Sequence, residues 1–281
     1  MMEQYEFGEM ELRSYLKKLS ADERAVGTRA KYARDLRLLH RWLAGRALTQ
    51  ELIAAWKAEL LQRGNAAQTV NSKLAAVNGF CGFMCWAIRA RYLKVQRSAF
   101  RDAARELTRG DYEKLLRTAE KTGQQRLGLL METLCATGIR VSELRYITVE
   151  AARKGRAEVF LKGKIRTVLI PHKLCKKLLI YARAEQRVAG ELFCTKNGST
   201  LSRRQIWYEL KRLCRAAGVA ESRVFPHNFR HLFAQAFYSL SRDIVKLADV
   251  LGHSSIETTR IYLISTGAEH QRQLERLGLV L

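Results

Sequence analysis

Arginine, histidine and glutamate recur in the second half of the chain at spacings that suit anion chemistry. Arg140 follows Gly138 in LCATGIRVSEL, and Glu143 lies close enough to hold the guanidinium in place. His227 and Arg230 are three residues apart in FPHNFRHLF, so on a helix they would share a face. A guanidinium makes two parallel hydrogen bonds to a phosphate and keeps its charge. These residues predict a phosphate pocket, although Arg140 and Glu143 alone could be a surface ion pair, and His227 and Arg230 alone could be a surface or N-cap residue and a salt-bridge partner.

The stretch LGHSSIETTRIYL adds a histidine and a tyrosine, His253 and Tyr262. Ser254 and Glu257 match a capping box, which predicts a helix that begins near Ser255. On one continuous helix, a spacing of nine residues would place the two side chains on opposite faces. The cap instead places His253 before the helix, free to point elsewhere. Alone they could be a turn residue and a core tyrosine; together they could supply a donor and a nucleophile.

Three basic residues lie at and beside the turn of a predicted β-hairpin. Residues 158–162 and 166–170 are short β-branched runs separated by three residues, so Lys162, Lys164 and Arg166 would lie around a tight turn. A lysine at a loop tip can enter a DNA groove, or give up a proton where neighbouring cations lower its pKa. The alternative is a solvated basic turn.

The remaining sequence has mainly helical periodicity. Thr108 and Asp111 form a second capping box, and a further helix is expected within GIRVSELRYIT. The other helices are predicted over residues 5–19, 22–43, 49–61, 69–92, 125–137, 174–185, 202–217, 227–240 and 242–251. The fold class is therefore mainly α with a small β-hairpin in the C-terminal domain.

The chain is expected to form two domains. Residues 1–93 predict a helical bundle, and residues 107–281 a second domain that ends in a tail with Leu274, Leu277 and Leu281 at helical spacing. The basic, weakly periodic residues 94–106 are interpreted as a linker, with a helix extension as the alternative.

Composition favours a nucleic-acid partner. Fifty Lys and Arg stand against 27 Asp and Glu, a formal net charge of +23. The first 100 residues hold 17 basic and 9 acidic residues and the remainder 33 and 18, so both domains are expected to contact DNA. The predicted DNA-binding residues are Arg29, Lys31, Arg34, Lys73, Lys164 and Arg166.

The six cysteines form no CxxC pair and are interpreted as reduced core thiols. No apolar run approaches the ~18 residues of a membrane span, and no signal sequence is recognised. We expect a cytoplasmic protein without membrane contact.

In order and spacing, these residues resemble the tyrosine recombinase (phage integrase) family. The motifs are G-I-R-V-S-E-L, the hairpin lysine, H-x-x-R, L-G-H and a tyrosine nine residues later, and the resemblance covers nearly the whole chain. TRAKYARDL and TVNSKL are similar to the family's core-binding (SAM-like) domain, and the size is similar to Xer-type and simple mobile-element integrases. The family hairpin often reads K-G-x-K-x-R and is one residue shorter here, so Lys162 is aligned with the catalytic lysine and Lys164 is the alternative.

The resemblance implies a site-specific recombinase that cleaves and rejoins DNA through a 3′-phosphotyrosine, with no metal, cofactor or ATP. It implies these roles: Tyr262 as nucleophile, Arg140 and Arg230 as the phosphate clamp, His253 as a donor, His227 as base or second donor, Lys162 as the acid for the leaving 5′-oxygen, and Glu143 as the group that orients the arginine.

The resemblance also implies a two-domain C-shaped clamp around duplex DNA and a homotetramer on two DNA sites, with an accessory directionality factor as a possible partner. The tail would dock on a neighbouring protomer or fold back on its own domain.

Two other functions fit the same residues less fully: a type IB topoisomerase-like relaxing enzyme, and a non-catalytic DNA-binding regulator. The DNA target and the choice among integration, excision, inversion and dimer resolution are not encoded in these motifs, because recognition is spread over many contacts.

Overall fold

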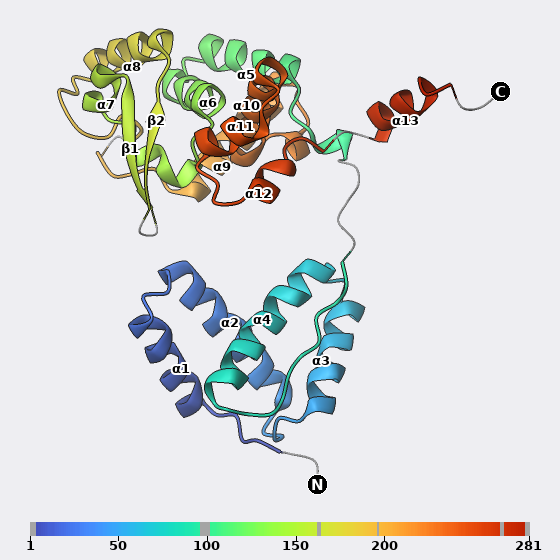
Figure 1. Ribbon diagram of the computed structural model, residues 1–281. Helices are drawn as coiled ribbons and strands as arrows, with labels where there is room; N and C mark the ends of the chain where they lie inside the picture. Colours follow the sequence, from blue (N-terminus) through green and yellow to red (C-terminus); the bar gives the residue numbers. More distant parts are fainter. Residues whose placement is uncertain (1–3, 96–101, 162–163, 196, 265–266, 279–281) are drawn as a thin grey trace. The chain divides into compact units, whose positions relative to one another are not determined.

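The computed structural model describes residues 4–95, 102–161, 164–195, 197–264 and 267–278 (Figure 1). The chain divides into two compact units, Met1–Arg97 and Ser98–Leu281. Both are helical, and the second also contains one two-stranded antiparallel sheet, so the predicted mainly α fold with a small hairpin is confirmed. Of the predicted linker over 94–106, residues 96–101 lie outside the described residues. No helix in the described ranges is both long enough and apolar enough to cross a membrane.

Four helices form the first unit. They are α1 (Glu9–Ala21), α2 (Val26–Leu43), α3 (Gln50–Gln62) and α4 (Ala67–Phe83). Thr49 caps α3, because its hydroxyl accepts a hydrogen bond from the Leu52 N–H at 3.2 Å. The apolar faces of α2 and α4 meet in the core, where Leu36, Leu74 and Phe80 are fully buried. The periodicity that predicted these helices is therefore the pattern of their buried faces.

The helix predicted over 69–92 is too long. Helix α4 ends at Phe83 because Cys85 adopts a left-handed conformation with φ 55°, and the Trp86 N–H then donates to the Cys81 carbonyl at 3.0 Å. Cys85 is exposed, so the interpretation of all six cysteines as core thiols is wrong at this position.

After this turn the chain runs extended along α4, held by side-chain amides. Asn78 both donates to the Ala90 carbonyl and accepts from its N–H, at 3.0 and 2.7 Å. Asn71 makes the same pair of bonds with Leu93, at 2.9 and 2.8 Å. The amides satisfy backbone groups that a helix would have paired internally, and periodicity alone does not reveal such long-range partners.

The second unit is built around α6. Its elements are η1 (Ala103–Arg105), α5 (Arg109–Lys121), α6 (Gln125–Thr137), η2 (Val141–Tyr146), α7 (Val149–Lys154), β1 (Arg156–Leu161), β2 (Lys164–Leu169), α8 (His172–Ala184), α9 (Arg203–Ala217), η3 (Glu221–Arg223), α10 (Pro226–Ser241), α11 (Ile244–Leu251), α12 (Ile256–Arg260) and α13 (Gly267–Glu275). Helix α6 contacts α5, α8 and α10, and the hairpin lies beside α7 (Figure 1). The predicted capping box of α5 is confirmed: the Asp111 N–H donates to Thr108 Oγ1 at 3.1 Å, and the Thr108 N–H donates to Asp111 Oδ2 at 3.4 Å.

The hairpin register decides which cations face inward. Leu161 pairs with Lys164, which leaves two residues for the turn instead of the predicted three. Those two residues, Lys162 and Gly163, lie outside the described residues. Side chains alternate along β2, so Ile165 and Leu169 are exposed while Arg166 shares the inward side with buried Val168.

Two local predictions near the site have different outcomes. The helix expected within GIRVSELRYIT is present, as a 3-10 helix of six residues: the Glu143 carboxylate binds the backbone at its start and the Ile147 N–H closes its end on the Leu144 carbonyl at 2.9 Å. Helix α12 has Ser255 as its N-cap residue, with no side-chain capping bond, so the Ser254–Glu257 capping box does not form. His253 does precede this helix, as predicted.

Candidate active site

Arg140 is placed by the end of α6. Gly138 ends that helix in a left-handed conformation with φ 62°, and a Cβ at this position would overlap the Phe233 ring. The chain then turns, so that Arg140 leaves the helix axis in an extended conformation (φ −76°, ψ 146°). Its side chain stays 36% exposed, which keeps the guanidinium accessible to an anion.

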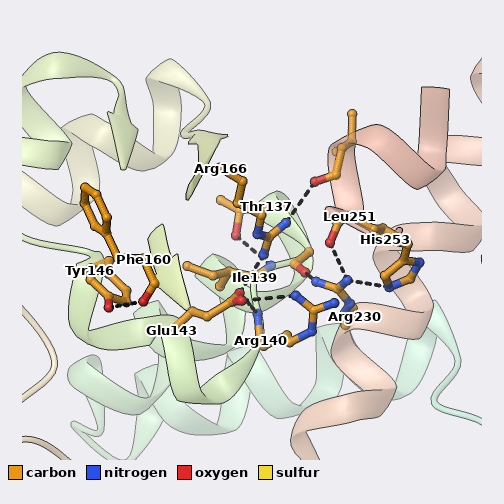
Figure 2. Close-up of polar contacts among 12 residues, drawn as sticks. Thr137, Ile139, Arg140, Glu143, Tyr146, Phe160, Arg166, Arg230, Leu251 and His253 are labelled. Carbon is orange, nitrogen blue, oxygen red and sulfur yellow. Dashed lines mark hydrogen bonds and ion pairs between the residues drawn. The ribbon is translucent and has the colours of Figure 1, made fainter. Parts of the chain in front are cut away.

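Glu143 holds two arginines from different elements. Its side chain is 1% exposed, and its Oε1 accepts from Arg140 Nη1 at 3.1 Å while its Oε2 accepts from Arg166 Nη2 at 2.5 Å (Figure 2). Burial by itself would raise the pKa of Glu143, but the hydrogen bond from the Arg140 N–H and the charges of Arg166 and Arg140 lower it overall. Glu143 thus remains an anion that orients both guanidinium groups.

Arg166, predicted as a DNA contact, is 15% exposed and lies inside the site. Besides Glu143 it binds the Val250 carbonyl through Nη1 at 3.1 Å. Its aliphatic stem packs on Gly252, which has φ 64° and where a Cβ would overlap it. Arg166 therefore ties β2 to the C-terminal end of α11, just before His253. The alternation of β2 carried this signal, because Arg166 shares the inward side with the apolar Val168 and Ile170.

Arg230, on α10, is the most enclosed cation of the site, at 2% exposure. It donates to the Gly138 carbonyl, to the Leu251 carbonyl at 2.7 Å and to His253 Nε2 at 2.8 Å (Figure 2). Its Nε donates to Tyr262 Oη at 3.3 Å. Burial lowers the pKa of Arg230 to about 10, and the charge of Arg140 acts in the same direction. It nevertheless stays cationic at neutral pH.

The hydrogen bonds of His253 fix its tautomer. A guanidinium only donates, so Nε2 accepts from Arg230 and the proton lies on Nδ1, which donates to Thr259 Oγ1 at 2.8 Å. Burial, with the nearby Arg230 and Arg140, lowers the pKa of His253 to about 4. The imidazole is therefore neutral. The predicted site did not include Thr259, which is fully buried on α12 and whose carbonyl accepts from the Tyr262 N–H at 3.0 Å.

Tyr262 lies among three histidines. Its ring is 2% exposed and stacks parallel to that of His253, with centroids 5.7 Å apart and planes at 11°. The rings of His231 and His227, both on α10, lie 4.6 and 5.5 Å from it. Burial and the charges of Arg230 and Arg140 lower the pKa of His227. The predicted site did not include His231, although its position next to Arg230 in the sequence was the available signal.

The structure brings together most of the predicted catalytic residues and leaves one unassigned. Arg140, Glu143, His227, Arg230, His253 and Tyr262 lie in one cluster of the second unit. Lys162 lies outside the described residues, and so does the side chain of Lys164. In the first unit, Lys31, Arg34 and Lys73 surround Asp35, and Arg29 donates to Ser20 Oγ at 2.5 Å.

The chemistry of the cluster is that of an anion site with a nucleophile. Three guanidinium groups supply positive charge, two neutral imidazoles supply donor and acceptor nitrogens, and a phenol lies within hydrogen-bonding distance of one guanidinium. Within the described part of the chain, no group of three or more His, Cys, Asp and Glu side chains is arranged to hold a metal.

Comparisons with known proteins place both units in one family. Residues 105–269 match the model of the phage integrase family, and residues 12–87 match that of the phage integrase N-terminal SAM-like domain. The chain is 30% identical over 266 residues to tyrosine recombinase XerD of Pseudomonas aeruginosa, covering 85% of this chain and 86% of that protein. It is also 30% identical over 233 residues to tyrosine recombinase XerA of Pyrococcus furiosus, covering 79% of each.

Solved structures share the fold at lower identity. The Tn1549 transposon integrase in complex with transposon right end DNA superposes with a TM-score of 0.73 at 15% identity, over 95% of this chain and 99% of that one. A lambda integrase dimer bound to a COC′ core site superposes with a TM-score of 0.69 at 20% identity, over 90% of this chain and 76% of that one.

Proposed function

The chain belongs to the phage integrase family of tyrosine recombinases, and from this membership and the site geometry we propose how it recombines DNA. It is a site-specific DNA recombinase that cleaves and rejoins DNA strands. The observation that carries the assignment of roles is the placement of the Tyr262 hydroxyl against the Arg230 guanidinium, at 3.3 Å, with His253 bound to the same guanidinium.

In the proposed reaction, Tyr262 Oη attacks the scissile phosphorus. A bond forms between this oxygen and phosphorus, and the bond to the 5′-oxygen breaks, which leaves a 3′-phosphotyrosine and a free 5′-hydroxyl. The phenol proton passes to His227, which is neutral because its pKa is lowered. Lys162 protonates the leaving 5′-oxygen. Attack by a 5′-hydroxyl on the phosphotyrosine reverses these steps, so the bond energy is retained without ATP.

Arg140 and Arg230 are proposed to bind the non-bridging phosphate oxygens. Fixed cations in a partly dehydrated site stabilise the charge that develops in the transition state. Arg140 has the exposed guanidinium, whereas Arg230 must exchange part of its present set of bonds for the phosphate. The phosphate charge would raise the pKa of His253, so that protonated Nε2 becomes a donor. These cations of the chain itself perform the charge stabilisation, so the proposed mechanism requires no metal.

DNA contact by both units is proposed from the distribution of charge. Arg29, Lys31, Arg34 and Lys73 belong to the first unit, and Lys164 to the hairpin of the second. Contacts of this kind to backbone phosphates dominate affinity and weaken steeply with salt. For Arg166, the buried ion pair with Glu143 favours a positioning role instead of direct DNA contact.

The further proposals concern the assembly of protomers on DNA and the genetic element to which the recombinase belongs. A homotetramer on two DNA sites would allow strands to be exchanged, with the tail of one protomer docked on its neighbour and an accessory factor able to set direction. The proposed setting is a mobile genetic element, with DNA in the cytoplasm as the substrate.

A nicked suicide duplex tests the function. The full chain is expected to form an SDS-resistant protein–DNA adduct, because loss of the short 5′ fragment prevents religation. Tyr262→Phe is expected to retain DNA binding and to form no adduct. Equal DNA retention by both proteins without any adduct would contradict an enzymatic function and favour a regulator. Plasmid relaxation without exchange between two sites would favour a type IB topoisomerase-like activity.

A further inference from the structure

Asp35 is a buried carboxylate surrounded by three cations. It lies on α2 with 1% exposure, and its Oδ2 is 2.6 Å from Lys31 Nζ. Its Oδ1 is 3.5 Å from Arg34 Nε and 3.8 Å from Lys73 Nζ. Lys31 and Arg34 belong to α2, whereas Lys73 comes from α4, so the carboxylate joins the cations of two helices.

A negative charge at this position needs a local explanation. A carboxylate beneath a cationic surface lowers its attraction for a polyanion, and burying a charge is unfavourable unless it is paired. The gain is in geometry. A free lysine loses side-chain rotamer entropy when it is fixed on a phosphate. Asp35 already fixes Lys31, whose ammonium also donates to the Ser72 carbonyl at 3.2 Å.

The three cations line one surface pocket. Its volume is about 280 Å³, and it is also lined by Asp35 and by Gln68, Thr69 and Ser72 from the first two turns of α4. The side chain of Lys31 is 35% exposed and that of Arg34 is 73% exposed, so their charges reach solvent. The pocket therefore combines preorganised positive charge with hydroxyl and amide groups, the donor set that binds backbone phosphate in protein–DNA complexes.

We propose that this pocket binds one phosphate of the DNA backbone and that Asp35 is the positioning residue that holds Lys31, Arg34 and Lys73 in the phosphate-binding arrangement. The proposal rests on the proposed function in one respect, namely that DNA is the polyanion. Asp35 lines the same pocket but is only 1% exposed and has the same sign of charge as phosphate, so in this proposal it acts on DNA through the cations and not by direct contact.

Asp35→Asn provides a test in which charge and geometry predict opposite signs. The substitution raises the net charge from +23 to +24, because one of the 27 acidic residues is lost. A role limited to charge would tighten DNA binding. Positioning predicts binding weaker by about tenfold or more, and a slope of log K against log salt that is smaller in magnitude by about 1, since one phosphate contact is lost. Binding of the full chain to labelled mixed-sequence duplex DNA is measured in the Tyr262→Phe background, which removes covalent trapping.

Asp22→Asn is the matched control. It makes the same charge change at an exposed acid paired with Lys18 at 2.5 Å, and it is expected to leave binding as tight as before or tighter. Binding by Asp35→Asn that equals or exceeds that of Asp22→Asn would overturn the proposal. Lys31→Met tests whether Asp35 acts through Lys31. If it does, the fold-loss of DNA affinity in the double variant Asp35→Asn/Lys31→Met should be clearly smaller than the product of the two single fold-losses.

Two further measurements separate the possible failures. If Asp35→Asn does not fold, as judged by circular dichroism, Asp35→Glu replaces it: the charge is kept while the carboxylate moves by one methylene, and wild-type binding and salt slope would overturn the proposal. The suicide-duplex adduct of the wild type reports on the recombinase function independently, so a missing adduct with weakened Asp35→Asn binding would contradict that function and leave the phosphate pocket supported.

Discussion

At the scale of single residues, each charged side chain of the candidate active site that the structure describes is paired with another polar group of the chain. Glu143 binds two guanidinium groups, and Arg230 donates to two carbonyls, a histidine and a tyrosine. The electrostatic repulsion among the guanidinium groups is thus offset by these bonds in the folded protein, before any phosphate binds. DNA binding must replace some of these bonds. Predictions at this scale therefore concern the protonation of single side chains and the loss of single bonds.

We predict that stability decreases below neutral pH because of His253. Its pKa is about 4 in the folded chain and 6.5 as a free side chain, so the unfolded state binds more protons between these values. The contribution is fully present above pH 6.5 and is lost as the pH falls toward 4; His227 acts in the same direction. Between about pH 7.5 and about pH 5, a loss of about 1 kcal/mol is expected, allowing for solvent screening. Urea unfolding measures it, and His253→Gln should show a clearly smaller loss; equal losses would contradict this origin.

Arg166→Met is predicted to slow strand cleavage without a comparable loss of DNA affinity. Removing the guanidinium releases Glu143 and the C-terminal end of α11 before His253, so Arg140 is no longer held in one orientation. Misplacement of a catalytic group by about 1 Å can cost as much as 100-fold, and a reduction of at least tenfold in the adduct-formation rate at saturating DNA is expected. Arg156→Met, at an exposed position of the same hairpin, is the control. A loss of affinity with an unchanged rate would instead support the predicted DNA contact.

At the scale of elements, the site is built where short elements end. Arg140 follows the end of α6, His253 precedes α12, and Tyr262 lies in the turn after that five-residue helix. Helix α10 supplies the regular framework, presenting His227, His231 and Arg230 from a single segment. Because turns at the positive-φ glycines Gly138 and Gly252 set the positions of Arg140 and His253, backbone conformation at these two helix ends controls the geometry of the site.

Gly252→Ala is predicted to destabilise the chain by about 2–3 kcal/mol and to reduce cleavage. Its φ of 64° is strained for alanine, and the new methyl group would overlap the Arg166 stem. Gly155→Ala is the matched control, because its φ is 69° but no atom lies within 4 Å of the added Cβ. The control should lose only about 1 kcal/mol in urea unfolding. Equal losses at the two positions would show that the contact with Arg166 has no energetic effect.

At the scale of the whole molecule, the positive charge is spread along the chain and the apolar tail surface is left open. Both units carry an excess of basic residues, as the counts before and after residue 100 indicate. On the tail, Leu274 and Leu277 are 55% and 60% exposed, at and just beyond the end of α13. Leu281 lies outside the described residues. Apolar side chains at this exposure gain from being covered by another surface, consistent with the proposed assembly on DNA.

Leu277→Glu is predicted to weaken assembly of several protomers on DNA that carries two sites, by about tenfold or more, while binding of one protomer to a half-site changes little. A charge at the centre of an apolar contact is costly to bury. Gln271→Glu, an equal charge change at an exposed polar position of α13, is the control. Native gel mobility measures both species. If the two variants assemble equally well, Leu277 does not lie in the protomer contact.

Local patterns in the sequence were sufficient to predict helices whose apolar period and end signals lie within one segment, such as α3, α5 and α6. They were also sufficient to predict the residue types of the site. Arg140, Arg230, His253 and Tyr262 could be named because their order and spacing match a family and their chemistry suits a phosphate. Lys162 stays a prediction. These inferences hold because hydrophobic period, capping and motif spacing are properties of neighbouring residues.

Tertiary structure alone decided which partners each side chain meets. The inward position of Arg166 depends on strand register, and its partners Glu143 and Val250 are 23 and 84 residues away in the chain. The proton on His253 Nδ1 is set by a guanidinium from another helix, and the role of Asp35 depends on a lysine from α4. Such contacts are long-range, so their geometry follows from packing of the whole unit and not from any local pattern.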